Sequence, residues 1–300
     1  MDIGFVGLGA MGRPMAALLG QSGHSVHGSD ARPAARGRAP ALQGLKLSRT
    51  PAAAAAKAEV LFTCLPNNAV VRDVYLGPQG LAPALKPGSI SVDCSTVGPS
   101  VTEEIAAALK PRQVHHMDAS MLGSVPQAET GEIGFVVGGD PGAYDCIGPL
   151  LDILGRFRVH AGPPGAANRI KLIHQTLVAI NAAAVAEAVG LCLATGTDLD
   201  CFYGVVKDGG GMAQSRYFER RVPRMRAGDF SPLFMLDFMA KDAGLARDLA
   251  RDSGFPTPIL DRALEIFRAC QAEGWGAEDF SAVAHHYEAL LGRGFADADS

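Results

Sequence analysis

The sequence has no excess of positive charge and no long run of basic residues. Lysine and arginine together number 27 against 31 acidic residues, which gives a net charge of -4 at pH 7 and a pI of about 6.1. A protein that binds nucleic acid through its surface field needs a basic patch. The composition therefore disfavours nucleic acid as a partner.

The cysteines form no CxxC pair and follow no regular spacing, which is typical of reduced thiols in a reducing compartment. Most of them are expected in or near a core. Two adjacent histidine pairs, 115–116 and 285–286, do not converge either, because neighbouring side chains point apart on a strand or a helix. We therefore predict no metal site. The cysteines are Cys64, Cys94, Cys146, Cys192, Cys201 and Cys270.

The sequence shows no secretion signal and no obvious membrane span. Its start carries no basic region, and its first apolar run, residues 3–10, breaks at glycines within the length of a strand. The alanine-rich stretches further along contain Lys, Glu or Asn. We expect a cytoplasmic protein that has no membrane as a partner.

Three hundred residues, 48% of them hydrophobic, favour two domains that each bury a core. Residues 1–160 alternate short apolar runs with helical stretches, the pattern of a mostly parallel sheet covered by helices. This pattern predicts an α/β fold with a doubly wound sheet. The candidate strands are residues 3–7, 25–29, 45–47, 60–65, 89–94, 114–119, 134–138 and 157–160.

A Gly-Pro-Pro-Gly stretch at residues 162–165 marks the expected domain boundary. It divides a sheet domain, 1–162, from an all-α domain, 163–300, which opens with one long interdomain helix at 166–195. That helix would be about 45 Å long and would bury one apolar stripe. The stripe is Ile170, Ile173, Leu177, Ile180, Ala184, Ala188 and Leu191. Further helices are expected at residues 199–207, 213–226, 232–252, 258–271 and 280–291.

A GxGxxG loop follows the first apolar strand and opens a helix, which is the context that a dinucleotide site requires. Gly7 lets the chain turn tightly, Gly9 leaves room for a pyrophosphate, and Gly12 lets the helix pack closely on the strand. The alternative is a glycine-rich turn that binds nothing. We predict a Rossmann-type domain whose first cofactor contacts are Gly7, Leu8, Gly9, Ala10, Met11 and Gly12.

An acidic residue, Asp30, stands eighteen residues after Gly12 at the end of the second strand. A carboxylate there binds the adenosine ribose hydroxyls and repels a 2'-phosphate, which favours NAD over NADP. The alternative role is a helix N-cap. Arg32 and Arg36 can bind a 2'-phosphate, so NADP stays open as the cofactor.

The string FVGLGAMGRPMA at residues 5–16 resembles the signature of the 3-hydroxyisobutyrate dehydrogenase family. Four more motifs resemble that family in the same order along the chain. They are Cys64-Leu65-Pro66, Asp93-Cys94-Ser95-Thr96, residues 162–171, and Phe230-Ser231-Pro232 with Lys241-Asp242. The resemblance implies that Leu65, Pro66 and Thr96 contact the cofactor, with Thr96 near its nicotinamide end.

The resemblance also implies that Lys171 transfers the proton and that Lys241 reaches the cofactor or substrate across a cleft. Oxidation of an alcohol needs a base for the hydroxyl proton, and a lysine whose neutral form is accessible can serve. Lys171 stands near the start of the long helix, where the helix dipole disfavours an ammonium. Its alternative role is a surface lysine on an amphipathic helix.

Two positions after Lys171 depart from the family, which usually has asparagine at both. His174 and Gln175 stand there and share the face of Lys171 one turn on. Gln175 keeps an amide on a longer arm, so we predict that it contacts the substrate. His174 adds a titratable group, whose alternative role is an ordinary hydrogen-bonded helix residue.

A second departure lies at residues 118–124, which read DASMLGS where relatives commonly read DAPVSGG. The serine that holds the substrate carboxylate in relatives aligns with Leu122. Hydroxyls remain at Ser120 and Ser124, and the backbone N–H groups of Leu122, Gly123 and Ser124 can form an anion nest. These residues are the predicted substrate contacts, for a small anionic substrate that differs from 3-hydroxyisobutyrate.

The sequence thus predicts an NAD(P)-dependent oxidoreductase for a small β-hydroxy acid, of the 3-hydroxyisobutyrate dehydrogenase or tartronate semialdehyde reductase type. Two alternatives stay open. One is an imine reductase of similar architecture, which generally lacks a lysine where Lys171 stands, and the other is a dinucleotide-binding module without catalysis. The small-residue-rich helix at 166–195 has more apolar surface than one domain covers, so we expect a homodimer or homotetramer.

Overall fold

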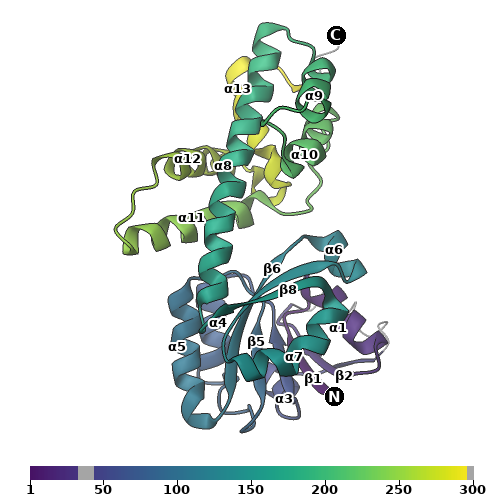
Figure 1. Ribbon diagram of the computed structural model, residues 1–300, viewed down its shortest axis with the longest axis vertical. Helices are drawn as coiled ribbons and strands as arrows, with labels where there is room; N and C mark the ends of the chain where they lie inside the picture. The colour runs from purple at the N-terminus through teal and green to yellow at the C-terminus, as the bar shows by residue number, and fades with distance from the viewer. Residues whose placement is uncertain (33–43, 296–300) are drawn as a thin grey trace. The chain divides into compact units, whose positions relative to one another are not determined.

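The computed structural model describes residues 1–32 and 44–295. Within it the chain forms two compact units, Met1–Lys171 and Leu172–Ser300 (Figure 1). The first contains a sheet with helices on both faces, and the second is built from helices. Each unit has its own hydrophobic core.

The sheet of the first unit has eight strands within the described residues, in the order β3-β2-β1-β4-β5-β6-β7-β8. All neighbouring pairs are parallel except β6 and β7. The strands are β1 (Asp2–Val6), β2 (Ser25–Ser29), β3 (Leu45–Leu47), β4 (Val60–Thr63), β5 (Ile90–Asp93), β6 (His115–Leu122), β7 (Ile133–Gly138) and β8 (Gly155–Gly162). Each predicted strand is found, and the order from β3 to β6 is that of a dinucleotide-binding sheet.

Helices cover both faces of this sheet, because alternate residues of each strand point to opposite sides. One core cluster joins Phe5 and Phe62 to α1, α6 and α7, and the other joins Val6 and Leu61 to α3, α4 and α5. The predicted doubly wound α/β fold is therefore confirmed. These helices are α1 (Gly12–Gln21), α3 (Pro51–Ala55), α4 (Asn68–Leu76), α5 (Pro99–Leu109), α6 (Val125–Thr130) and α7 (Pro141–Leu154), with a 3-10 turn, η1 (Lys110–Arg112).

The second unit is all-helical over its described residues, as predicted. Its long helix α8 (Ala166–Thr195) begins in the first unit and continues through the second. The remaining elements are α9 (Leu199–Asp208), α10 (Arg216–Arg226), α11 (Leu236–Asp252), α12 (Pro258–Ala272) and α13 (His285–Leu291), with 3-10 turns η2 (Trp275–Ala277) and η3 (Phe280–Ala284).

The predicted buried stripe of α8 is wrong. Ile173, Leu177 and Leu191 are 62%, 68% and 63% exposed, whereas the core face carries smaller residues such as Ala182 and Val189. Because α8 is apolar around most of its circumference, periodicity alone cannot choose the buried side. The same composition makes α8 long and apolar enough, by length and composition alone, to span a membrane, and half of that window is buried inside the protein.

Candidate active site

The loop between β1 and α1 has the geometry that its glycines predict. Gly7 adopts φ +97°, and a Cβ there would collide with the carbonyl oxygen of Cys64. A Cβ on Gly12 would collide with the carbonyl oxygen of Gly7, so close packing excludes any side chain at position 12. The space beside Gly9 is different. The atom nearest to a Cβ there is Nη2 of Arg32, at 3.0 Å, which is the end of a movable side chain.

Asp30 directly follows β2, is 9% exposed, and faces this loop. The backbone N–H groups of Leu8 and Arg32 donate to its two oxygens, each at 2.8 Å. The Arg32 guanidinium adds contacts at 3.2 and 3.3 Å. Burial raises the pKa of Asp30, but the hydrogen bonds from Arg32 and Leu8 outweigh burial and leave that pKa below its usual value.

The loops after β4 and β5 are tied together through Asp93, the last residue of β5. Its Oδ1 accepts hydrogen bonds from Thr63 Oγ1 at 2.7 Å and from Ser95 Oγ at 2.6 Å. Ser95 Oγ in turn accepts from the backbone N–H of Leu65 at 2.8 Å. Asp93 is 1% exposed, and burial raises its pKa despite these hydrogen bonds. It therefore fixes the two loops that carry Leu65 and Thr96.

A buried polar network continues from Asp93 towards β6. The Tyr75 hydroxyl lies 3.0 Å from Thr63 Oγ1 and 2.7 Å from Ser91 Oγ, which is 3.3 Å from His116 Nδ1. His116 is 4% exposed, and burial lowers its pKa to about 3. The imidazole is therefore neutral at physiological pH, because the buried ring has no water to solvate a positive charge.

The start of α8 is anchored on β6 by Asp118, which is fully buried. Its two oxygens accept hydrogen bonds from the backbone N–H groups of Gly165 and Asn168, each at 2.9 Å. Ser120, a predicted substrate contact, is 1% exposed and donates to Asn168 Oδ1 at 3.3 Å. The Ser120 hydroxyl thus supports the first turn of α8. Lys171 follows on the next turn and is 8% exposed.

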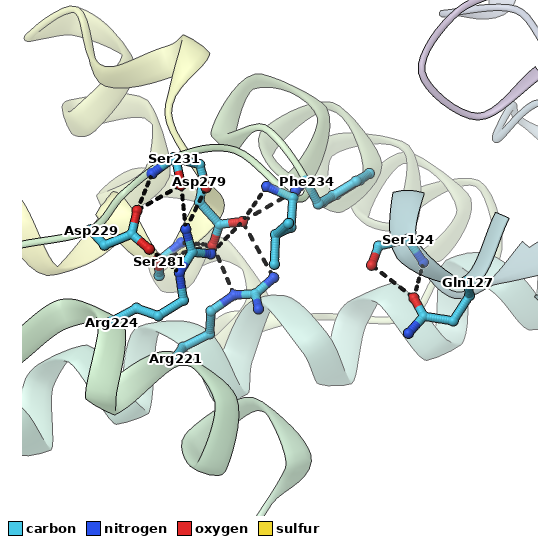
Figure 2. Close-up of polar contacts among 10 residues, drawn as sticks. Ser124, Gln127, Arg221, Arg224, Asp229, Ser231, Phe234, Asp279 and Ser281 are labelled. Atoms are coloured by element: carbon cyan, nitrogen blue, oxygen red, sulfur yellow. Dashed lines mark hydrogen bonds and ion pairs between the residues drawn. The ribbon is translucent and has the colours of Figure 1, made fainter. Parts of the chain in front are cut away.

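The turn after β6 contains the other predicted substrate contacts and one residue that sequence reasoning missed. Gln127 Oε1 accepts both the N–H and the hydroxyl of Ser124, each at 2.9 Å (Figure 2). Those are two of the donors predicted for a substrate carboxylate. Gly123 adopts φ +146°, and Leu122 is half-buried beside them. The Ser-x-x-Gln spacing of a capping box is the signal that identifies Gln127.

In the second unit, Gln175 of α8 and Lys241 of α11 meet at one carboxylate. Gln175 Nε2 donates to Asp242 Oδ2 at 2.7 Å, and Lys241 Nζ lies 3.0 Å from Asp242 Oδ1. His174 Nδ1 is 3.1 Å from Gln175 Oε1. Asp242 and Gln175 are 2% and 4% exposed. Asp242 was not singled out as a site residue, although it belongs to the Lys241 motif.

A separate ionic network holds the segment that leads into α11, the helix that carries Lys241. Asp279 is fully buried and accepts the backbone N–H groups of residues 233–234 at 3.0 and 3.2 Å. Arg221 Nε lies 2.8 Å from Asp279 Oδ1, and Arg224 joins the same cluster (Figure 2). Because a buried carboxylate needs such partners, this network fixes how α11 begins.

The structure thus brings the predicted site residues into two groups, one in each unit. In the first unit, the glycine loop, Asp30 and the loops after β4 and β5 lie at the carboxyl ends of neighbouring parallel strands, and the β6 residues extend beyond them. In the second unit, Gln175 and Lys241 share Asp242. Arg36, the second candidate for a 2'-phosphate, lies outside the described residues. Across 1–32 and 44–295, no three His, Cys, Asp or Glu side chains are grouped to hold a metal ion.

A doubly wound sheet with a glycine loop at its carboxyl edge, followed by a helical unit, defines the architecture of a dinucleotide-binding protein. Residues 2–162 match the NAD-binding domain of 6-phosphogluconate dehydrogenase, and residues 165–287 match the family described as NAD-binding of NADP-dependent 3-hydroxyisobutyrate dehydrogenase. The chain belongs to the 3-hydroxyisobutyrate dehydrogenase family of β-hydroxyacid dehydrogenases.

Relatives match this chain over nearly its whole length. It is 33% identical to 2-(hydroxymethyl)glutarate dehydrogenase of Eubacterium barkeri over 293 residues, 97% of this chain and 96% of the relative. It is also 33% identical to NAD-dependent L-serine dehydrogenase of Pseudomonas aeruginosa, over 97% of this chain and 99% of the relative. The Mycobacterium tuberculosis 3-hydroxyisobutyrate dehydrogenase structure with L-serine is 31% identical, with a TM-score of 0.86 and coverage of 94% and 97%.

Family membership confirms the predicted enzyme class. The protein is an NAD(P)-dependent dehydrogenase of a soluble enzyme family, and it acts on the CH–OH group of small hydroxy acids. This finding disfavours both alternatives that the sequence left open, an imine reductase and a non-catalytic module.

Proposed function

We propose that this enzyme uses NAD to oxidise a small β-hydroxy carboxylate whose substituent differs from the methyl group of 3-hydroxyisobutyrate. Lys171 is the proposed general base. The single observation that carries the proposal is the burial of Lys171, which at 8% exposed is not a surface lysine on an amphipathic helix. A lysine shielded from water in this position suits proton transfer to or from a substrate hydroxyl.

The residues of the first unit fit a dinucleotide. The space beside Gly9, which only the movable end of Arg32 approaches, suits a pyrophosphate. The ionised Asp30 carboxylate suits the adenosine ribose hydroxyls. The other proposed contacts are the loop residues from Gly7 to Gly12, with Leu65, Pro66, Thr96 and Lys241. Bound NAD supplies the hydride acceptor. The carboxylate of Asp30 favours NAD because it would repel a 2'-phosphate, and the L-serine relative is named as NAD-dependent.

Lys171 accepts the hydroxyl proton of the substrate at Nζ as hydride leaves the carbon, and returns it in the reverse reaction.

The turn after β6 is proposed to hold the substrate carboxylate through the N–H groups of Gly123 and Ser124. Gln127 holds the Ser124 donors at 2.9 Å, so the substrate displaces its amide. Leu122 contributes an apolar wall where relatives have a hydroxyl, which is the reason to expect a different substituent. Ser120 and Gln175 complete the predicted set.

The test is a turnover assay at 340 nm with a panel of β-hydroxy acids that includes 3-hydroxyisobutyrate, L-serine and 2-(hydroxymethyl)glutarate. We expect NAD reduction with at least one member other than 3-hydroxyisobutyrate. Leu122→Ser should raise kcat/KM for 3-hydroxyisobutyrate relative to the native substrate, because it restores a donor worth about 1–3 kcal/mol to a buried anion. A wild-type enzyme that prefers 3-hydroxyisobutyrate contradicts the assignment of Leu122.

We also propose a cytoplasmic homodimer or homotetramer. The supporting observation is that α8 exposes large apolar side chains to solvent, which a second copy of the chain would cover. They are Ile173, Leu177 and Leu191. The absence of regular cysteine spacing supports a reducing compartment.

A further inference from the structure

Asp242 joins two residues that the proposed function uses. It lies on α11, is 2% exposed, and takes the Gln175 amide at 2.7 Å and the Lys241 ammonium at 3.0 Å on separate oxygens. Side chains of adjacent helical residues do not normally face each other. The contact between Lys241 and its neighbour is therefore a specific feature of α11, and it holds the ammonium against the Asp242 carboxylate.

The same contacts fix the orientation of Gln175. An ionised carboxylate only accepts hydrogen bonds, so the amide nitrogen of Gln175 faces Asp242 and its oxygen faces His174 Nδ1 at 3.1 Å. Since an amide oxygen also only accepts, His174 Nδ1 carries a proton. An asparagine, the usual family residue at 175, has an arm one methylene shorter. The glutamine thus suits a bridge from α8 to Asp242.

We propose that Asp242 is a positioning residue that orients Lys241, and that Gln175, besides its proposed contact with the substrate, holds the Asp242 carboxylate in place. The inference rests on the proposed function in one respect, because it takes Lys241 as a contact to cofactor or substrate. Loss of Asp242 keeps the Lys241 side chain but removes the carboxylate that lies 3.0 Å from its ammonium. Loss of Gln175 removes one of the two partners that hold the carboxylate.

A purely structural role for Asp242 is the competing explanation, because the residue ties α8 to α11 within the second unit. The two roles predict different effects when Asp242 and Lys241 are replaced together. If Asp242 acts through Lys241, removing both residues costs no more than removing Lys241 alone. If Asp242 only stabilises the helix pair, its removal adds an independent loss whether or not Lys241 is present.

The experiment is a double-mutant cycle of Lys241→Met and Asp242→Asn in the full-length protein. The readouts are the Kd for NADH by fluorescence titration and kcat/KM for the best panel substrate. We expect each single variant to lose roughly tenfold in at least one readout, and the double variant to lie within about threefold of Lys241→Met. Losses that multiply in the double variant overturn the proposal.

A second cycle of Gln175→Met with Lys241→Met asks the same question and leaves Asp242 intact, in case Asp242→Asn does not fold. Non-multiplying losses support the proposal here too. The matched control is Asp237→Asn, also on α11, whose carboxylate takes the Gln271 amide at 2.6 Å but is exposed. It should change neither readout by more than about twofold. NADH binding needs no turnover, so a wild type that oxidises no hydroxy acid contradicts the proposed function while the binding cycle still decides this inference.

Discussion

Lys171 is the residue on which the proposed chemistry depends. Lys171→Ala should lower kcat by about two to four decades, because general base catalysis contributes roughly that much. The Kd for NAD should stay within a few-fold, since the proposed role concerns the substrate hydroxyl. The matched variant Lys171→Arg keeps the positive charge but cannot give up a proton, so it should be equally inactive. Turnover near the wild-type rate in either variant would remove Lys171 from the mechanism.

At the residue scale, we propose that Asp30 and Arg32 decide the cofactor preference. Their ion pair, 3.2 Å from Nε to Oδ1, would hold the guanidinium away from a 2'-phosphate. We expect the wild type to prefer NAD and Asp30→Ala to shift the ratio of kcat/KM towards NADP by about 10- to 100-fold, because a freed guanidinium can bind the phosphate. Asp30→Ala with Arg32→Ala should lose that gain. A wild type that prefers NADP would show that Arg32, not Asp30, governs the site.

At the scale of elements, two glycines of the loop between β1 and α1 have different expected roles. Gly12 is needed for stability of the fold, and Gly9 is needed for cofactor binding. Gly12→Ala should lower the Tm, because its Cβ collides with the backbone of Gly7. Gly9→Ala should keep the wild-type Tm but weaken NADH binding by about tenfold or more, since its Cβ meets only the end of Arg32 and fills the proposed pyrophosphate space. The control is Gly244→Ala on α11, where a Cβ meets open space. An unchanged Kd in Gly9→Ala would argue against the assigned cofactor loop.

Strands and helices could be predicted well from this sequence, because their signals are local. Short apolar runs, several of them ending in Gly, Pro, Ser or Thr, predicted each strand, and α8 has the predicted bounds. The first residue of a helix was harder to predict, because it depends on which side chain caps the helix. The helix expected from residue 213 begins at Arg216, since the Ser215 hydroxyl accepts the Phe218 N–H at 3.0 Å. The buried face of α8 could not be predicted, because apolar residues occupy nearly every side of it.

The candidate site was predictable only where its residues form local motifs. The spacing of the glycines and of Asp30 along the sequence is enough to predict that they lie together. In the structure the backbone N–H of Leu8 donates to Asp30. The contacts made across long separations were missed. Asp93 ties two loops together and Asp242 takes Gln175 from 67 positions away, and no periodicity or spacing encodes such pairs. Gln127 is the exception, since its capping spacing with Ser124 could have been used.

At the scale of the whole molecule, exposed leucines on α8 predict self-association. The wild type should sediment as a dimer or tetramer, and the pair Leu177→Gln with Leu191→Gln should shift it towards a monomer, because burial of these side chains contributes about 1.5–3 kcal/mol each. Val205→Gln on α9 is the control, since Val205 is similarly exposed, at 63%, but lies off the α8 stripe. A wild type that is monomeric at micromolar concentration would contradict the proposal.

The buried network around His116 predicts how the stability of the molecule responds to acid. Burial lowers the pKa of His116 to about 3 from 6.5, so between these values the unfolded chain binds a proton that the folded chain does not. Above pH 6.5 the His116 side chain therefore costs no folding stability. As the pH falls from 6.5 towards 3, its protonation in the unfolded chain lowers the free energy of unfolding. Burial raises the pKa of Asp93 and Asp118, which acts in the opposite direction, so only the difference between variant and wild type isolates the histidine.

His116→Gln keeps a donor for Ser91 and has no charge to gain. At pH 7 its Tm should lie below that of the wild type, because the variant lacks the imidazole ring that contacts Tyr75 edge-on, with 5.1 Å between the ring centroids. The deficit should shrink or reverse as thermal melts are repeated from pH 7 down to pH 4, since the variant has no buried imidazole to protonate. His115→Gln, at the half-exposed neighbouring position, should keep the acid dependence of the wild type. Parallel Tm curves for His116→Gln and wild type across that range would show that the buried imidazole does not control acid stability.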